Sequence, residues 1–203
     1  YPISLETSSN RMQLNLDGTV NMQCGETEIG QGADTAFAQM VSETLGVAYE
    51  NIHVISTQDT DITPWDPGAY ASRQTYTCAP AVHAVADELR RKLLCYAAEM
   101  TGHTPAALTI APTAQGDAVV FVRNAESVVV TLRDLAMDSF YNKDRGGQLS
   151  AEASFKTRQN PPSFGGCFAE VEVDIELCKV RITHILNVHD AGVIINPALA
   201  TAQ

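Results

Sequence analysis

The strictest pattern in the sequence is an alternation of apolar and acidic residues near its C-terminal end. Between residues 167 and 177 the two classes take alternate positions, with Cys167, Ala169, Val171, Val173, Ile175 and Leu177 set against Glu170, Glu172, Asp174 and Glu176. Successive side chains of a strand point to opposite faces of its sheet. We therefore predict a strand with one buried face and one acidic, solvated face. The chain turns near residues 177–179, and residues 180–188 predict the partner strand of a hairpin.

A second hairpin is predicted near the N-terminal end, where two alternating apolar runs, 12–16 and 20–24, flank Asp17-Gly18. An Asp-Gly pair between two such runs is a strong hairpin signal. Apolar residues at helical spacing follow from Phe37 to Leu45, and we expect Gly46 to end that helix. Residues 52–56 predict a further strand.

The middle of the chain predicts helices joined by short strands. We expect Pro80 to open a second helix at its first position, with a buried stripe formed by Val82, Val85, Ala86, Leu89, Leu93, Ala97 and Met100. Residues 117–122 predict a short strand, Thr131 is expected to cap a helix ending at Tyr141, and residues 142–166 are expected to be irregular. A last helix should begin at Asn196-Pro197. Because no βαβ unit repeats, the order favours an α+β fold with mixed or antiparallel sheets and packed helices.

Charge and hydropathy exclude two classes of partner. The 203 residues carry a formal net charge of −11, and an acidic surface repels phosphate backbones, so we expect no nucleic-acid partner. No apolar stretch approaches the 18 residues of a membrane span, so we expect no membrane partner. The low charged fraction, 18%, fits a piece that buries surface against other domains and equally fits a polar surface rich in Ser, Thr and Asn.

The five cysteines and the two ends of the chain indicate its setting. The cysteines are odd in number, widely spaced and form no CxxC pair, which favours reduced thiols in a cytoplasmic protein. Each lies in an apolar run, so we expect core packing. The chain opens on Tyr1 and stops at Gln203, just after a helix-opening signal. We therefore expect residues 1–203 to be a fragment that is cut at its C-terminal end.

The loop from Gly25 to Gly32 has the form G-x4-G-Q-G between a predicted strand and a predicted helix. In this setting backbone N–H groups and the helix dipole can face an anion. The Lys-Ser/Thr pair of a Walker A loop is replaced by Gln31-Gly32, so no Mg-nucleotide site is predicted. A neutral Gln both donates and accepts hydrogen bonds, which suits a ligand with amide and anionic edges. A tightly packed structural turn would use the same glycines.

A second polar segment, residues 68–75, lies just before the second predicted helix. Its small residues allow close approach to the backbone, and Ser72, Gln74 and Thr75 offer hydrogen-bonding side chains. Arg73 adds a cation suited to phosphate. A hydroxyl-capped helix with an exposed Arg would explain the segment equally well.

Protein-ligated metals and acid–base catalysis have little support in the sequence. The five histidines form no HxxxH or HxH pair, so no metal site built from side chains is predicted. His189-Asp190 could suggest acid–base chemistry. Adjacent residues of a strand point to opposite faces, however, and no nucleophile motif accompanies them.

Four segments taken together resemble one protein family. In order, they are Gly25-x-Thr-Glu-Ile-Gly-Gln-Gly with Thr35, residues 68–75, Phe164-Gly165 with residues 169–174, and Asp190-x-Gly192 through Asn196-Pro197 with Gln203. Along nearly its whole length the chain resembles the second half of the molybdenum-cofactor-binding domain of the xanthine dehydrogenase and aldehyde oxidase family. The amino-acid sequence of residues 56–76 and 134–152 most resembles that of bacterial xanthine dehydrogenase molybdenum-binding subunits.

The resemblance implies a molybdopterin cofactor, extended to the cytosine dinucleotide in many bacterial members. Its molybdenum is held by pterin sulfurs and by oxo or sulfido ligands, with no side chain coordinating it. The implied cofactor contacts are Gly30, Gln31, Gly32, Ala71, Ser72, Arg73, Gln74, Thr75 and Gln203. Ala71 is expected to lie nearest the metal.

The resemblance also implies hydroxylation of a purine such as xanthine or hypoxanthine, with water as the oxygen source. The general-base glutamate belongs to a motif expected beyond Gln203, so we expect no catalytic residue in this chain and no activity from it alone. Electrons would leave through 2Fe–2S clusters and FAD on other subunits or domains. Two alternatives stay open: an aldehyde or N-heterocycle hydroxylase of the same family, and a non-catalytic interaction domain of this fold.

Overall fold

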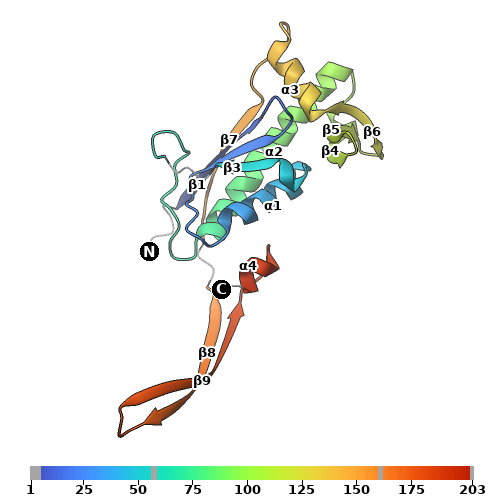
Figure 1. Cartoon of the computed structure of the whole chain (residues 1–203). Helices are drawn as coiled ribbons and strands as arrows, with labels where there is room; N and C mark the ends of the chain where they lie inside the picture. The colour runs from blue at the N-terminus through green and yellow to red at the C-terminus, as the bar shows by residue number, and fades with distance from the viewer. Residues whose placement is uncertain (1–5, 56–58, 160–161, 202–203) are drawn as a thin grey trace. The chain divides into compact units, whose positions relative to one another are not determined.

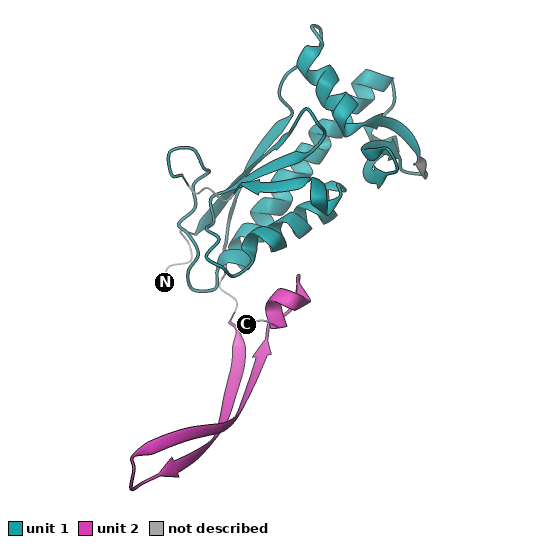
Figure 2. Ribbon diagram, viewed as in Figure 1, with its two compact units in different colours: residues 1–158 teal, residues 159–203 magenta. Residues whose placement is uncertain are grey.

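The computed structural model describes residues 6–55, 59–159 and 162–201, which form two compact units (Figure 2). Unit 1 spans residues 1–158 and unit 2 spans residues 159–203. Unit 1 contains β1 (Thr7–Leu14), β2 (Val20–Cys24), α1 (Ala33–Leu45), the 3-10 helix η2 (Tyr49–Asn51), β3 (Ile52–Ile55), α2 (Gln74–Thr101), η3 (Pro105–Ala107), β4 (Leu108–Thr113), β5 (Gly116–Phe121), β6 (Asn124–Thr131), α3 (Leu132–Tyr141) and β7 (Ser150–Lys156) (Figure 1). Unit 2 contains β8 (Phe164–Asp174), β9 (Lys179–Asp190) and α4 (Pro197–Thr201).

The main sheet of unit 1 has four strands in the order β3-β2-β1-β7. β1 pairs antiparallel with β2 and β7, and β2 pairs parallel with β3. The predicted hairpin at Asp17-Gly18 is confirmed, with Met12 opposite Met22 and Leu14 opposite Val20. The sheet is therefore mixed, as the α+β prediction required.

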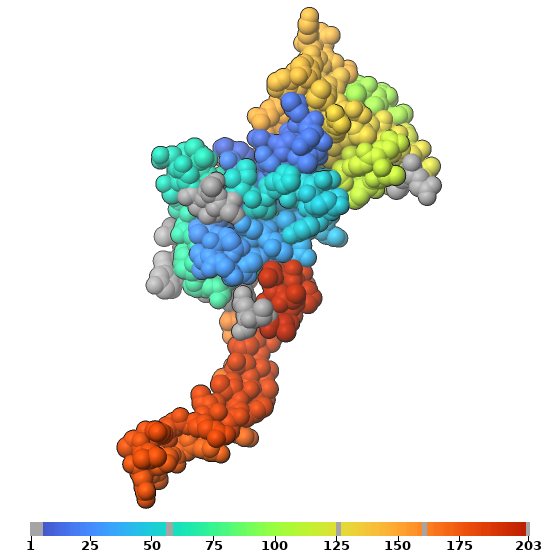
Figure 3. Space-filling view, in the orientation of Figure 1, coloured from blue at the N-terminus to red at the C-terminus, as the bar shows by residue number. Residues whose placement is uncertain are grey.

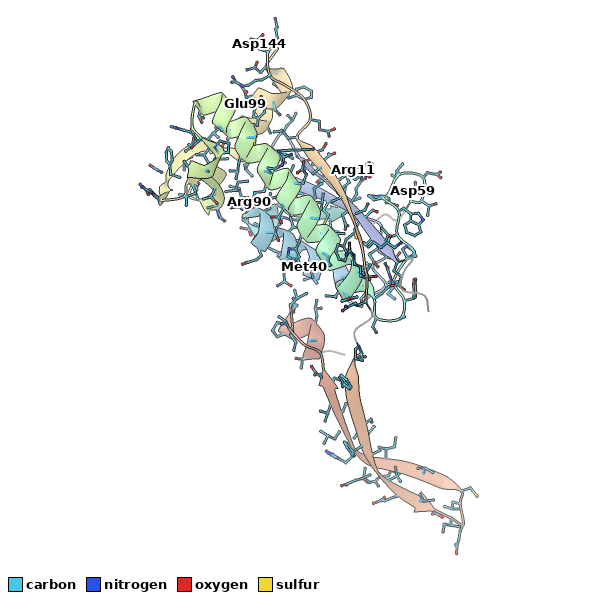
Figure 4. All side chains as sticks on the ribbon, turned by 180° about the vertical axis from the view of Figure 1, so that it is seen from behind. Arg11, Met40, Asp59, Arg90, Glu99 and Asp144 are labelled. Carbon is cyan, nitrogen blue, oxygen red and sulfur yellow. The ribbon has the colours of Figure 1, made fainter. Side chains whose placement is uncertain are left out.

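Helices α1 and α2 cover one face of this sheet, as Figure 4 shows from the helix side. The apolar residues of β1 and β2 that share a face are buried beneath them, together with Phe37 and Met40 of α1. The predicted stripe of α2 is buried from Val82 to Ala97, and Met100 packs at its edge. Gly46 ends α1 in a left-handed conformation, with φ of 85°, as predicted.

The predicted start of the second helix is wrong. Helix α2 begins at Gln74, and Pro80 lies inside it. A proline inside a helix removes one backbone hydrogen bond and is normally a boundary signal. The preceding turn nevertheless forms, with its Thr77 N–H donating to Arg73 O at 2.8 Å, and it buries Thr77 and Cys78 completely. Tertiary packing overrides the local preference.

A second, antiparallel sheet in unit 1 has the order β4-β5-β6 and packs against α3. Its centre is the predicted strand at residues 117–122, but β4 and β6 were not predicted. The Thr131 cap of α3 is confirmed, since its side chain accepts from the Asp134 N–H at 3.0 Å. The prediction that residues 142–166 are irregular is wrong for β7, which is held in the main sheet by β1, and for the first residues of β8.

Unit 2 is a two-stranded antiparallel hairpin followed by α4. The predicted strands are confirmed, with Val171 opposite Ile182 and Val173 opposite Val180. The sequence predicted that one face of the first strand is buried. In the described residues of unit 2 that face is not buried, because every residue of β8 and β9 is exposed. The unit consists of one ribbon and one short helix, which cannot cover an apolar face. The last helix begins at Pro197, as predicted.

The cysteines divide between core and surface. Cys24 and Cys78 are buried, with their Sγ atoms 3.5 Å apart. Cys95 is half-buried, and Cys167 and Cys178 are exposed. The expectation of core packing is therefore correct for two of the five. Among the residues described, no helix combines the length and apolar character needed to cross a bilayer.

Candidate cofactor-binding site

The two loops singled out in the sequence meet through the side-chain amides of Gln31 and Gln74. Gln31 Nε2 donates to Gln74 Oε1, and both amide nitrogens also donate to the carbonyl oxygen of Thr27, each at 3.2 Å. Gln31 Oε1 accepts from the Ile29 N–H at 2.7 Å. The start of α1 and the start of α2 lie side by side on the surface of unit 1 (Figure 3). The sequence predicted both loops as ligand segments, and the structure brings them together.

The N–H groups at the start of α1 are taken up by a carboxylate of the protein. Glu28 Oε1 accepts from the N–H groups of Gly30 at 2.7 Å and Gly32 at 3.1 Å, and Oε2 accepts from Asp34 at 3.1 Å. Burial by itself would raise the pKa of Glu28, but these backbone donors outweigh it and hold the pKa below its usual range. The backbone N–H groups of Gly30, Gly32 and Asp34 thus already have an acceptor within the protein.

Gly30 and Gly32 give the loop its path. Their φ angles of 99° and 82° lie in the left-handed region, where residues with a Cβ are strained. A Cβ at Gly30 would meet nothing within 4 Å, so the loop faces open space there. Gly25 differs, because a Cβ there would lie 2.3 Å from Pro64 O. The loop is therefore packed tightly at one end and open at the other.

Ala71 and Ser72 form an exposed turn directly before α2. Both have left-handed φ angles, 51° and 56°, which is unusual for two successive residues other than glycine. The Arg73 N–H closes the turn on Tyr70 O at 3.1 Å. Gln74 and Thr75, predicted to lie in the loop, instead form the first turn of α2, where Gln74 is half-buried and Thr75 is exposed. Strained backbone of this kind gathers at ligand-binding sites.

Arg73 points into the protein. Its Nη1 donates to Glu26 Oε1 at 2.6 Å, to Asp66 Oδ1 at 2.9 Å and to Gly68 O at 2.8 Å. Its Nε donates to Glu6 Oε2 at 3.3 Å. The side chain is only 3% exposed, and those of Glu26 and Asp66 are 0% exposed. No local pattern predicts this cluster, because its members lie in four separate segments.

Charge in the Arg73 cluster is unbalanced, since three carboxyl groups surround one guanidinium. Burial, Asp66 and Cys78 raise the pKa of Glu26 far above its usual range, against the opposing effect of Arg73. Burial would lower the pKa of Arg73, but Asp66 and Glu26 outweigh it and raise that pKa. Burial and Asp66 thus favour the protonated form of the Glu26 carboxyl, while Arg73, whose Nη1 donates to Glu26 Oε1 at 2.6 Å, favours the ionised form.

The other candidate residues lie elsewhere or outside the described chain. His189 stands opposite Gly165 in the hairpin of unit 2, and Asp190 Oδ1 accepts from the Gly192 N–H at 3.1 Å. Gln203 lies outside the described residues. Within the described ranges, no group of three His, Cys, Asp or Glu side chains could hold a metal ion.

The accessible polar groups at the junction suit a cofactor that carries its metal on its own atoms. They comprise the exposed Ser72 and Thr75 hydroxyls and the half-buried Gln31 and Gln74 amides, with open space beside Gly30. These groups donate and accept hydrogen bonds without supplying the thiolate, imidazole or carboxylate sets that ligate metals. Neutral donors of this kind fit the polar edges of a pterin and its phosphate.

Comparison with known proteins agrees with this chemistry. The family model described as "Molybdopterin cofactor-binding domain" matches residues 2–203. The chain is 53% identical over 203 residues to the protein named putative xanthine dehydrogenase molybdenum-binding subunit XdhA of Escherichia coli K12, covering 100% of this chain and 26% of that protein. It is 31% identical over 202 residues to a probable hypoxanthine oxidase of the same organism, covering 98% of this chain and 20% of that protein. The chain thus spans between a fifth and about a quarter of the length of these relatives.

Solved structures show the same fold. The CO dehydrogenase of Oligotropha carboxidovorans superposes with a TM-score of 0.76 at 24% identity, over 96% of this chain and 24% of that one. Quinoline 2-oxidoreductase from Pseudomonas putida 86 gives 0.75 at 20% identity, over 97% and 25%. The resemblance drawn from the four sequence segments is confirmed, and the chain belongs to the molybdopterin cofactor-binding domain family.

Proposed function

We propose that this chain is the cofactor-binding portion of a molybdenum hydroxylase that oxidises purines such as xanthine or hypoxanthine, with water as the oxygen source. The observation that carries the proposal is the Gln31–Gln74 junction, which presents both predicted cofactor loops on one surface. The substrate class is supported by the names of the two relatives described above. The general base and the rest of the substrate pocket belong to the remaining part of such a subunit.

We assign the cofactor contacts to Gly30, Gln31 and Gly32 of the first loop and to Ala71, Ser72, Gln74 and Thr75 of the second, with Gln203 as a further contact. The amides of Gln31 and Gln74 fix each other, so their outward edges are held ready to bind the pterin. The small side chain of Ala71 leaves room for the metal end of the cofactor. Arg73, the remaining sequence candidate, has a side chain that is only 3% exposed.

The proposed cofactor is molybdopterin in its cytosine dinucleotide form, which supplies the oxygen-transfer and redox chemistry when bound. This chain's residues orient that group and hold no proton in the reaction. Electrons would pass to 2Fe–2S clusters and FAD on partner subunits or domains, and the assembled enzyme would work in the cytoplasm. The chain alone should show no turnover with xanthine, hypoxanthine or an aldehyde.

The test uses the full-length parent subunit, purified intact and assayed with xanthine, hypoxanthine and an N-heterocycle such as nicotine. Turnover of a purine at the highest kcat/KM supports the proposal. Preference for the heterocycle would replace the purine assignment, because a nicotine 6-hydroxylase large subunit is also a relative, at 26% identity. Absence of turnover together with absence of molybdenum would favour an interaction domain.

A further inference from the structure

We propose that Arg73 is a positioning residue: its buried guanidinium ties the Gly25–Gly32 loop to the turn at Ala71 and Ser72 and so sets the cofactor-facing surface that the two loops share. The inference rests on the proposed function of these loops. It replaces the direct phosphate contact expected for Arg73 from the sequence with an indirect role, exerted through the residues that the guanidinium holds.

The side-chain contacts of Arg73 reach the first loop, the segment before the turn and the chain at the start of β1. Glu26 belongs to the first loop, Asp66 and Gly68 to the segment before the turn, and Glu6 and Thr7 to the start of β1, where Thr7 O accepts at 3.5 Å. Asp66 also accepts from the Gly68 N–H at 2.7 Å, which closes the segment on itself. Movement of either loop would therefore break a buried contact of Arg73.

The backbone next to Arg73 needs such an anchor. Ala71 and Ser72 hold left-handed φ angles, a conformation that costs L-residues free energy and persists only where the surroundings enforce it. Arg73 follows this turn and hydrogen-bonds two residues that precede it. Its backbone N–H donates to Tyr70 O, and its Nη1 donates to Gly68 O. Its guanidinium also lies 5.5 Å from the centre of the Tyr70 ring.

A direct phosphate contact would require the guanidinium to leave these acceptors. The side chain is 3% exposed, and withdrawing it would strand Asp66, whose side chain is 0% exposed. The guanidinium presents several N–H donors in one plane, so it can serve several acceptors in one site. A Lys ammonium cannot reproduce this arrangement. Geometry and burial both favour an anchor over a ligand.

The first experiment measures hydrogen exchange in the cofactor-free parent subunit, comparing wild type with Arg73→Lys. Exchange at the amides of residues 30–32 and 71–74 should accelerate together by about tenfold or more, because the Lys ammonium keeps the charge but cannot reach all the acceptors that the guanidinium holds, which leaves buried carboxyl groups without their donors. Arg145→Lys is the matched control, since Arg145 pairs with Asp138 at 3.0 Å beside α3. Unchanged exchange, or a change confined to one loop, would overturn the inference.

The second experiment distinguishes a positioning role of Arg73 from direct phosphate binding by whether Asp66→Ala lowers or raises the molybdenum retained per protein. Asp66 is fully buried and cannot touch a bound cofactor, so its only route to the site is through Arg73 and the backbone. Asp66→Ala should lower the molybdenum retained per protein, as Arg73→Lys does. If Arg73 bound phosphate directly, Asp66→Ala would free the guanidinium and increase retention, which would overturn the inference.

The two readouts keep this inference apart from the proposed function. Exchange in the cofactor-free subunit reports only whether Arg73 couples the loops. If exchange accelerates in both loops while molybdenum retention is unchanged, the coupling is confirmed and the assignment of the loops to the cofactor fails.

Discussion

The side-chain amide of Gln31 hydrogen-bonds that of Gln74, which lies 43 positions further along the chain, and both amides share the carbonyl oxygen of Thr27. The bond joins the loop before α1 to the first turn of α2. Both N–H groups of the Gln31 amide are used within the protein, on Gln74 Oε1 and Thr27 O, so one Gln74 N–H and one lone pair on each amide oxygen remain for the proposed ligand. A mutual constraint of this kind holds both side chains in one geometry before anything binds.

Removing either amide should lower cofactor content in the parent subunit. Gln31→Ala and Gln74→Ala should each cost about 1–3 kcal/mol of binding, because a polar partner is left unsatisfied. The double variant should lose less than the sum, since the two side chains act as a pair. Gln148→Ala is the control, as Gln148 is exposed and bonds Gln13 Oε1 in a different part of unit 1. Molybdenum per protein is the measurement, and additive losses would contradict a shared role.

Enlarging Ala71 should abolish turnover of the parent enzyme without unfolding it. The methyl group of Ala71 is exposed, so a larger side chain projects outward toward the proposed cofactor and away from the core. We expect Ala71→Leu to change the free energy of unfolding by no more than about 0.5 kcal/mol, the usual range for surface changes. Ala84→Leu, on the exposed side of α2, should keep both stability and rate. Near-normal rates in Ala71→Leu would show that this residue does not face the cofactor.

Two glycines of the first loop should respond differently to an added methyl group. Gly25→Ala places a Cβ 2.3 Å from Pro64 O, so we expect a loss of about 1–3 kcal/mol from overpacking. Gly30→Ala meets open space and carries only the backbone cost of its left-handed φ, about 1–2 kcal/mol. Gly25→Ala should therefore also speed proteolysis of residues 59–70, whereas Gly30→Ala should not. Equal behaviour of the two variants would contradict the close packing at Gly25.

The free energy of unfolding of the parent subunit should depend on pH because the Glu26 carboxyl ionises at a different pH in the folded and unfolded states. The groups facing its carboxyl are Asp66, Arg73, Cys78 and Cys24. The pKa of Glu26 is higher in the folded protein than in the unfolded chain. Glu26 therefore does not reduce the free energy of unfolding below its unfolded-state pKa. As pH rises from that value through the folded-state pKa, the free energy of unfolding falls. Glu26→Gln stays neutral and should remove that loss. Urea unfolding of both proteins from about pH 4.5 to about pH 9 measures it, and parallel stability profiles would contradict a raised pKa at Glu26.

Local signals predicted several elements of the fold because short-range chemistry decides them. The Asp17-Gly18 hairpin, the left-handed Gly46 that ends α1 and the hydroxyl cap at Thr131 depend on neighbouring residues alone. The alternation in residues 167–177 likewise predicted β8 and its partner β9. Pro80 gave a wrong prediction of the start of α2, because the turn before it depends on contacts with residues far along the chain. Thr77 and Cys78 in that turn are fully buried.

The candidate site was only partly predictable. Its two loops were recognisable from Gly25–Gly32 and from residues 68–75, yet nothing local shows that Gln31 meets Gln74. The Arg73 cluster joins residues up to 67 positions apart, so it requires the folded chain. Glu26 and Glu28 lie two positions apart in the first loop, yet Glu28 accepts from backbone N–H groups at the start of α1 whereas Glu26 is buried beside Arg73, a difference that only the folded chain shows.

The most direct test of cofactor binding is the molybdenum and cytidine nucleotide content of the full-length parent subunit, purified intact and measured by elemental and mass analysis. We predict both in amounts comparable to the protein, with a clear fall of both in the Gln31→Ala/Gln74→Ala double variant while the fold survives. A correctly folded parent that contains neither molybdenum nor cytidine nucleotide, or a double variant that retains both in full, would contradict the account.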